Sequence, residues 1–453
     1  MLRLIVLFGA ILTACSQELS TTLKISVKDY NLTTEIERYL STTDASVENQ
    51  VIERILKHKV SNEEIKSILR KEITHENVLG GYQKSLNSSH NGKKYSHALY
   101  FPKGEIPKSG VPLIVILHGM GGHGETTLPR WIPRLKNHFA ILCPSYPMGA
   151  WWSANAEKLI LDLIGQIKKN YPVDHNRVFL SGLSNGAIGA FWIGMNHPDR
   201  FAGIAPIAGG ITERLMRFLV NLRNTPIYII HGKSDPVFPV ALLRRVNHIL
   251  ADMKYPAVYR EHNETTSAHG GHFMPDSETK PLAEWLEKQN RKILPITIRM
   301  TREQNHLDPI YWANILKGNR LAALQMPGPE RETLNIKDGK IATLFVTRKK
   351  NNRFEAAVEN VLDYEIYVNK EMIDFDQPVR VTTQELRDIK GQMIAGKKKV
   401  SFNRKINPDP KVLLSGFKKR KDKDLLFDAV IKVSSETRYE MARSSEAKRI
   451  TVK

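Results

Sequence analysis

The sequence predicts an α/β fold with a mostly parallel sheet, preceded by a short helical segment and followed by a small antiparallel β-domain. Three observations carry this prediction. Strand-like and helix-like runs alternate through the middle of the chain, as they do in parallel α/β sheets. Residues 112–117 form an unbroken apolar run, which is typical of a strand buried on both faces. Residues 177–195 are compatible with a strand, a sharp turn and a helix in immediate succession.

The N-terminus has the pattern of an export signal. Residues 4–12 are apolar, too short to span a bilayer, and follow a short positive start, as in a secretory signal. The run ends at Leu12-Thr13-Ala14-Cys15, which resembles the bacterial lipoprotein signal. We therefore expect residues 1–14 to be removed and lipid to be attached to Cys15. The protein would then be anchored in the bacterial cell envelope, either periplasmic or surface-exposed, and a plain cleaved signal is the alternative.

Residues 15–78 are expected to form a polar tether and two or three short helices. Apolar side chains recur at helical spacing between residues 32 and 74. Ser61 followed by Glu64 fits a capping box at a helix start. We interpret this segment as a structural appendage, and a regulatory or lid role is the alternative.

Residues 79–295 are predicted to form the α/β domain. A hairpin of residues 82–86 and 95–100 is expected around Asn91-Gly92, a favoured tight turn. After residues 112–117, further strands are expected at residues 140–143, 178–180, 204–208, 227–230 and 258–261, and helices at residues 156–169, 240–253 and 280–289.

Residues 296–453 are predicted to form a β-rich domain with a basic tail. Short β-prone segments lie at residues 310–315, 334–336, 340–346, 354–359, 364–368 and 379–382. The chain has a net charge of +20, and this region holds 32 Lys and Arg against 21 Asp and Glu, a net of +11. No aromatic-interleaved basic motif accompanies the charge, so no nucleic-acid partner is expected. The lysine runs at residues 397–399 and 418–421 are interpreted as solvated loops.

The segment Gly182-Leu183-Ser184-Asn185-Gly186 fits a nucleophile elbow, in which a strained turn between strand and helix exposes a serine. The alternative is a glycine-rich turn whose serine caps the next helix. A serine hydroxyl needs a base to take its proton and an acid to orient that base. In this arrangement the order along the chain is serine, acid, histidine.

The best candidate acid is Asp235, which follows the predicted strand at residues 227–230. The best candidate base is His272, because it lies last in the required order and closest to the final helix. His269, three residues earlier, is the alternative base. A metal site formed by His262, His269 and His272 lacks carboxylates or cysteines at ligand spacing and is disfavoured.

The oxyanion of an acyl-transfer reaction needs two preorganised N–H donors. The amide of Asn185, next to the serine, should be one of them. The second should come from the loop at residues 118–122, where we expect the Met120 amide, with Gly121 as alternative. His118 is expected to brace this loop. The pair Trp151-Trp152 could line the substrate pocket or pack beneath a loop.

With Leu117-His118-Gly119-Met120-Gly121-Gly122, the elbow around Ser184, His231-Gly232-Lys233-Ser234-Asp235 and Gly271-His272 in order, the chain resembles the α/β-hydrolase superfamily. Within it, residues 82–290 resemble secreted carboxylesterases of the polyhydroxybutyrate depolymerase and feruloyl esterase-like group. The resemblance implies ester hydrolysis through an acyl-enzyme, without a metal or organic cofactor. Such exported members often carry disulfides, whereas Cys143 has no partner once Cys15 is lipidated.

We therefore expect a membrane-anchored serine hydrolase, a carboxylesterase acting on a small-molecule or polymeric ester. Two alternatives stay open at this point. One is a serine peptidase of the prolyl oligopeptidase-like type. The other is a non-catalytic surface-binding lipoprotein in which the basic C-terminal domain is the working part.

Overall fold

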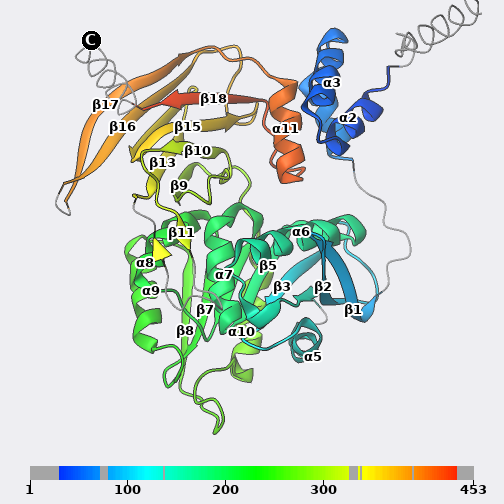
Figure 1. Ribbon diagram of the computed structural model, residues 1–453, viewed down its shortest axis with the longest axis vertical. Helices are drawn as coiled ribbons and strands as arrows, with labels where there is room; N and C mark the ends of the chain where they lie inside the picture. The colour runs from blue at the N-terminus through cyan, green and yellow to red at the C-terminus, as the bar shows by residue number, and fades with distance from the viewer. Residues whose placement is uncertain are drawn as a thin grey trace, which may run out of the picture. The chain divides into compact units, whose positions relative to one another are not determined.

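The computed structural model describes residues 30–71, 80–135, 138–325, 335–336, 339–389 and 392–435 (Figure 1). The lipid-attachment prediction at Cys15 lies outside these residues. The chain divides into two compact units, residues 1–70 and 71–453. Within the described residues, no helix is both long and apolar enough to cross a bilayer.

The first unit contains three short helices, α2 (Leu32–Ser41), α3 (Ala45–Lys57) and α4 (Asn62–Leu69). Their apolar faces are buried, for example at Ile36, Val51 and Ile65. The predicted capping box is confirmed: Ser61 Oγ accepts a hydrogen bond from Glu64 N, and the Glu64 carboxylate accepts one from Ser61 N.

The second unit begins with an eight-stranded sheet in the order β1-β2-β4-β3-β5-β6-β7-β8. β1 and β2 are antiparallel to their neighbours, and the strands from β4 to β8 are parallel. The strands are β1 (Gly81–His90), β2 (Lys93–Phe101), β3 (Val111–Leu117), β4 (Ala140–Pro144), β5 (Val173–Leu183), β6 (Gly203–Ile207), β7 (Ile227–Gly232) and β8 (Ala257–His262). The predicted hairpin and parallel strands are therefore all present.

Helices cover both faces of this sheet. They are α5 (Gly124–Leu135), α6 (Ala154–Asn170), α7 (Asn185–Asn196), α8 (Glu213–Met216), α9 (Val240–Asp252) and α10 (Thr279–Glu287), with 3-10 turns η2 (Pro147–Gly149), η3 (Pro198–Arg200), η4 (Arg217–Asn224) and η5 (Asp276–Glu278). Helix α5 was not expected from the sequence. This helix contains Pro129 and Pro133, residues that normally interrupt a helical pattern.

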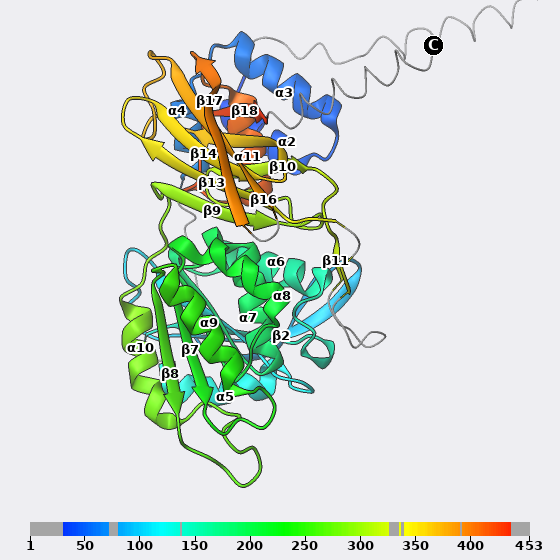
Figure 2. The same cartoon turned by 90° about the vertical axis from the view of Figure 1, so that its left-hand side faces the viewer.

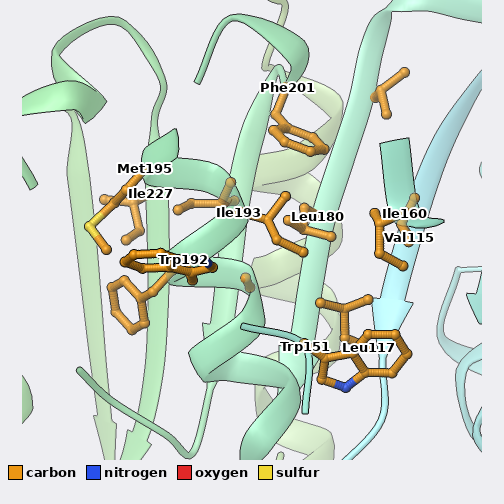
Figure 3. Packing of buried hydrophobic residues seen from close by; sticks show 14 of the residues in the cluster. Val115, Leu117, Trp151, Ile160, Leu180, Trp192, Ile193, Met195, Phe201 and Ile227 are labelled. Atoms are coloured by element: carbon orange, nitrogen blue, oxygen red, sulfur yellow. The ribbon is translucent and has the colours of Figure 1, made fainter. Parts of the chain in front are cut away.

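Two apolar cores lie against the two faces of the sheet. Along β3, Val115 and Leu117 point into the core beneath α6, α7 and α9, and Ile114 and Ile116 into the core beneath α5 and α10. Figure 3 shows part of the first core, where Trp151 and Leu117 lie near the end of β3. The apolar run that predicted a doubly buried strand is completely buried.

The C-terminal region is a β-sandwich, here called the β-domain. One sheet has the order β17-β16-β14-β13-β9 and the other β10-β15-β18, and β11 pairs with β12. A common apolar core fills the space between the two larger sheets. The elements are β9 (Thr297–Arg302), β10 (Ala313–Gly318), β11 (Leu324–Gln325), β12 (Asn335–Ile336), β13 (Ala342–Lys349), β14 (Arg353–Glu359), β15 (Val361–Val368), β16 (Val379–Ile389), β17 (Gln392–Arg404), α11 (Pro410–Arg420) and β18 (Ala429–Ser434).

Two local predictions for this region were wrong. The lysines at residues 397–399 belong to strand β17, in which Lys398 and Lys399 pair with β16 while the side chains stay solvated. The second lysine run lies at the C-terminal end of helix α11, where cations are favoured by the negative end of the helix dipole.

The pairing of β14 with β16 is parallel, so the sandwich is not wholly antiparallel.

The β-domain is attached to the amino ends of β5, β6 and β7 by buried ion pairs. Arg291, after α10, forms a salt bridge with Asp422, and Arg420 Nη1 lies 2.9 Å from Asp199 Oδ2. Arg302 donates to the carbonyl of Asn196, the last residue of α7. In Figure 2 the arrows of β7 and β8 point away from the β-domain. The carboxyl edge of the sheet is therefore left uncovered by it.

A second buried network joins α6 and α7 to the β-domain. Glu157 Oε1 lies 2.8 Å from His197 Nε2, and Glu157 Oε2 lies 3.1 Å from His306 Nε2. Burial alone would lower the pKa of His306, but its hydrogen bonds to the carboxylates of Glu157 and Glu303 raise it to about 9. Burial would raise the pKa of Glu157, but its hydrogen bonds to the two imidazoles hold it well below its usual range. The protonated His306 therefore ties the two domains together.

We predict that His306→Gln destabilises the protein at neutral pH by about 2–4 kcal/mol, because it leaves buried carboxylates without their cation. The raised pKa means that this contribution is complete below pH 6.5 and is lost as the pH rises through about 9. Urea unfolding at pH 7 and pH 10 should show a smaller difference between the variant and the parent at pH 10. His248→Gln, in an exposed pair with Asp252, is the matched control and should change little. A His306→Gln deficit that is equal at both pH values would contradict the assignment.

Candidate active site

Ser184 lies between β5 and α7 in a strained backbone conformation, with φ 59° and ψ −119°. Left-handed values are costly for a residue with a side chain and persist where the surrounding structure enforces them. A Cβ added at Gly182 would lie 2.3 Å from Gly186 O, and one added at Gly186 would lie 2.0 Å from Leu117 O. Only glycine fits at both positions, and this close packing holds the turn that exposes the serine.

Asp235 and His272 form a close pair. His272 Nδ1 lies 2.8 Å from Asp235 Oδ2, and the Asp235 side chain is fully buried. The other carboxylate oxygen accepts hydrogen bonds from the amides of Val237 at 2.8 Å and Phe238 at 2.9 Å. The Phe238 ring also stacks on the imidazole, with 5.9 Å between ring centroids. These contacts fix the orientation of the imidazole and leave Nε2 as its second nitrogen for proton transfer.

The two other histidines of this region lie in different surroundings. His269 is exposed, and its backbone amide donates to Thr266 Oγ1 at 3.0 Å. His262 is buried against Phe273, and neither of its ring nitrogens has a hydrogen-bond partner. Over the described ranges, no group of three or more His, Cys, Asp or Glu side chains could hold a metal ion. The geometry thus pairs the acid with His272.

The sheet order brings the serine, the acid and the base to one edge. β5, β6, β7 and β8 are parallel neighbours, so their carboxyl ends meet at the same side of the sheet. Ser184 follows β5, Asp235 follows β7 and His272 follows β8. A Cβ added at Gly232 would lie 2.2 Å from Gly271 O, so the loop before His272 presses on the end of β7. Among the hydrogen bonds of the described residues, none joins Ser184 Oγ to His272; such bonds are often long without substrate.

The loop after β3 lies beside the serine. A Cβ added at Gly119 would lie 3.3 Å from Ser184 Cβ. Gly122 N donates to Gly119 O, and Gly121 has φ 69°, as a tight turn with glycine at its third residue requires. That closing bond does not use the amides of Met120 or Gly121. Both predicted donors of the loop therefore remain candidates.

His118 braces this loop, as expected. The amide of Tyr146 donates to His118 Nε2 at 3.2 Å, so Nδ1 carries the proton and donates to Gly119 O at 2.7 Å. Burial lowers the pKa of His118, which favours this neutral form. Trp151 is completely buried, and its Nε1 donates to the His118 carbonyl at 2.8 Å. Of the two readings for this tryptophan, the structure favours packing beneath the loop.

An apolar rim of three exposed side chains at the carboxyl edge of the sheet was not predicted from the sequence. Met120, Met148 and Val237 are 68%, 56% and 58% exposed, and each belongs to a loop at the carboxyl edge of the sheet. Asn185 Nδ2 donates to the Met148 carbonyl at 3.1 Å, which ties the loop after β4 to the elbow. Met148 has φ 55°, a conformation that its sequence neighbourhood did not suggest.

Comparisons with known proteins agree with this fold. The model of the phospholipase/carboxylesterase family matches residues 152–290. A bifunctional acetylxylan esterase/xylanase from Neocallimastix patriciarum is 28% identical over 152 residues, which are 31% of this chain and 21% of that protein. Poly(3-hydroxyalkanoate) depolymerase C from Paucimonas lemoignei is 43% identical over 51 residues, which are 11% of this chain and 12% of that protein. The matches thus span less than a quarter of either relative's length.

Among solved structures, a thermostable esterase is 24% identical and covers 46% of this chain and 63% of its own, with a TM-score of 0.40. The mostly parallel sheet and the strained serine turn together give this part of the chain an α/β-hydrolase fold. Within that class, the chain is similar over residues 152–290 to the phospholipase/carboxylesterase family.

We predict that Gly232→Ala lowers both stability and turnover, because the new methyl group would collide with the backbone of Gly271. Overpacking of this kind costs about 1–3 kcal/mol and would displace the loop that carries His272. Thermal unfolding and the kcat for a p-nitrophenyl ester would measure the two effects. Gly165→Ala, inside α6 with no atom near the added Cβ, should be neutral or slightly stabilising. Unchanged kcat in Gly232→Ala would contradict the proposed coupling between this contact and the site.

Proposed function

We propose that this protein is a serine carboxylesterase that cleaves an ester through an acyl-enzyme intermediate. The observation that carries the proposal is the 2.8 Å contact between His272 and the buried Asp235, on the same sheet edge as a serine in a strained elbow. The family match supports ester hydrolysis as the class of reaction.

In the proposed mechanism Ser184 Oγ attacks the ester carbonyl carbon while His272 Nε2 takes the hydroxyl proton. Asp235 keeps the Nδ1 proton in place and stabilises the imidazolium. The amides of Asn185 and Met120 donate to the oxyanion; as the first helical residue, Asn185 has no intrahelical acceptor for its N–H. Collapse of the intermediate breaks the bond to the alcohol oxygen, which receives the proton from His272. Water then attacks the acyl-serine in the same way, and the acid is released.

Two alternatives fit less well. A prolyl oligopeptidase-like peptidase would use the same three side chains, but the family match is to phospholipases and carboxylesterases. Hydrolysis of peptide anilides in preference to short p-nitrophenyl esters would favour the peptidase. A non-catalytic surface-binding protein would have no need for a strained serine beside an ordered His–Asp pair.

We predict that an active-site-directed fluorophosphonate labels the parent protein, and that Ser184→Ala abolishes the labelling. His272→Ala should slow labelling and ester turnover by about 10³-fold or more, because the serine loses its base. His269→Ala, the matched control in the same loop, should retain both. Labelling that survives His272→Ala and fails in His269→Ala would reverse the assignment of the base. No labelling of the parent at all would favour the non-catalytic alternative.

We also propose that the mature chain is lipid-anchored through Cys15 in the bacterial envelope, on the strength of the leader sequence alone. Growth in a bacterium with labelled fatty acid should then label the parent and leave Cys15→Ser unlabelled. Cys143 is buried, so Cys143→Ser is the control and should keep the label. Equal labelling of the parent and Cys15→Ser would refute the anchor.

A further inference from the structure

Strands β16 and β17 form a long two-stranded ribbon that runs past the rest of its sheet. β14 pairs with β16 only from Arg380 to Glu385, whereas β16 and β17 stay paired out to Ile389 and Gln392. The outer part of the ribbon is visible as the orange strands at the left of Figure 1. It has no apolar core of its own, and an isolated two-stranded ribbon is marginally stable in water.

The ribbon exposes apolar side chains at its outer part. Every residue of β17 from 392 to 400 is exposed. In the outer part, Met393 and Ile394 keep 53% and 48% of their surface in contact with solvent, and Val400, which pairs with Thr382 nearer the rest of the sheet, keeps 48%. Because successive side chains of a strand point to opposite faces, Met393 and Ile394 give the outer part of the ribbon exposed apolar surface on both faces.

The same ribbon is strongly basic. β17 carries Lys397, Lys398, Lys399 and Arg404 and no acidic residue. On β16, Arg380 and Arg387 are balanced by Glu385 and Asp388, so the described ribbon has six basic and two acidic side chains, a net charge of +4.

Lysines on an edge strand also prevent pairing with other chains, which explains their presence without any ligand. Lys398 Nζ in addition lies 3.5 Å from Glu355 Oε2 of β14. Edge protection does not explain why Met393 and Ile394 are exposed on the same strand, because these residues make an edge more prone to pairing. Apolar side chains beside a cluster of lysines match the chemistry of an anionic lipid interface, with an apolar interior under phosphate groups.

We propose that the β16–β17 ribbon docks this protein on anionic lipid surfaces. Met393 and Ile394 would enter the boundary between headgroups and acyl chains, and the lysines at residues 397–399 would contact lipid phosphates. The β-domain is attached at the amino ends of β5 to β7, whereas Ser184 lies beyond the carboxyl end of β5. The docking surface is thus separate from the candidate active site, and the proposal stands independently of the enzymatic one.

The test uses the chain from Ser16 onward, which keeps every described residue and lacks the lipid-attachment site. Cosedimentation with vesicles of phosphatidylglycerol should show binding that weakens at high salt, and vesicles of phosphatidylcholine should bind at least tenfold more weakly. Met393→Ser/Ile394→Ser and Lys397→Glu/Lys398→Glu should each reduce binding to phosphatidylglycerol at least tenfold.

Two controls match these variants in chemistry. Lys108→Glu/Lys288→Glu changes the net charge equally at exposed sites of the hydrolase domain, and Ile106→Ser removes another exposed apolar side chain. Both should bind like the parent, and all variants should keep the parent's rate on a soluble p-nitrophenyl ester. Equal binding by the ribbon and control variants, or equal binding to both lipids, would overturn the proposal. So would a dimer in analytical ultracentrifugation that Met393→Ser/Ile394→Ser dissociates while lipid binding is absent, since the ribbon would then contact a second copy.

Discussion

The close backbone contact at the carboxyl edge of the sheet is the constraint on which the site depends. Gly182 and Gly186 leave no room for a Cβ where β5 turns into α7, and Gly232 leaves none where β7 meets the loop of His272. These two contacts set how far the serine and the imidazole stand from their strands. The buried carboxylate of Asp235, held by two backbone amides, then fixes the ring. Steric exclusion at three glycines therefore positions the polar groups.

The chain's own pattern predicted the parts of the site that depend on local structure. Each of the three candidate residues follows a strand that an apolar run predicts. The order Ser184, Asp235, His272 could therefore be recognised in the sequence. The apolar rim could not be predicted from the sequence. Its residue Met148 is placed by a long-range hydrogen bond from Asn185 and by a left-handed backbone conformation. The edge strand β17 was interpreted as a loop because its lysines are solvated, although the strand is defined by its pairing with β16.

The attachment of the β-domain was equally hidden from the sequence. Arg291, Arg420 and Asp422 resemble ordinary surface charges until the fold places them opposite their partners. These buried pairs tolerate little change in geometry, because a buried charge without its partner costs far more free energy than an exposed one. His306 adds a proton to the same interface, held by carboxylates from both sides of it. The interface is therefore specific as well as extensive, although its stabilising contribution is smaller than the number of charges suggests.

The reciprocal arrangement of these pairs has a consequence for how the chain can be rearranged. Arg291 comes from the hydrolase side and Asp422 from the β-domain, whereas Arg420 comes from the β-domain and Asp199 from the hydrolase side. A cut after residue 295 would leave both fragments with an orphaned buried charge. The half with the α/β-hydrolase fold therefore cannot be transferred by itself, and a chimaera with a related esterase would need both partners of each ion pair.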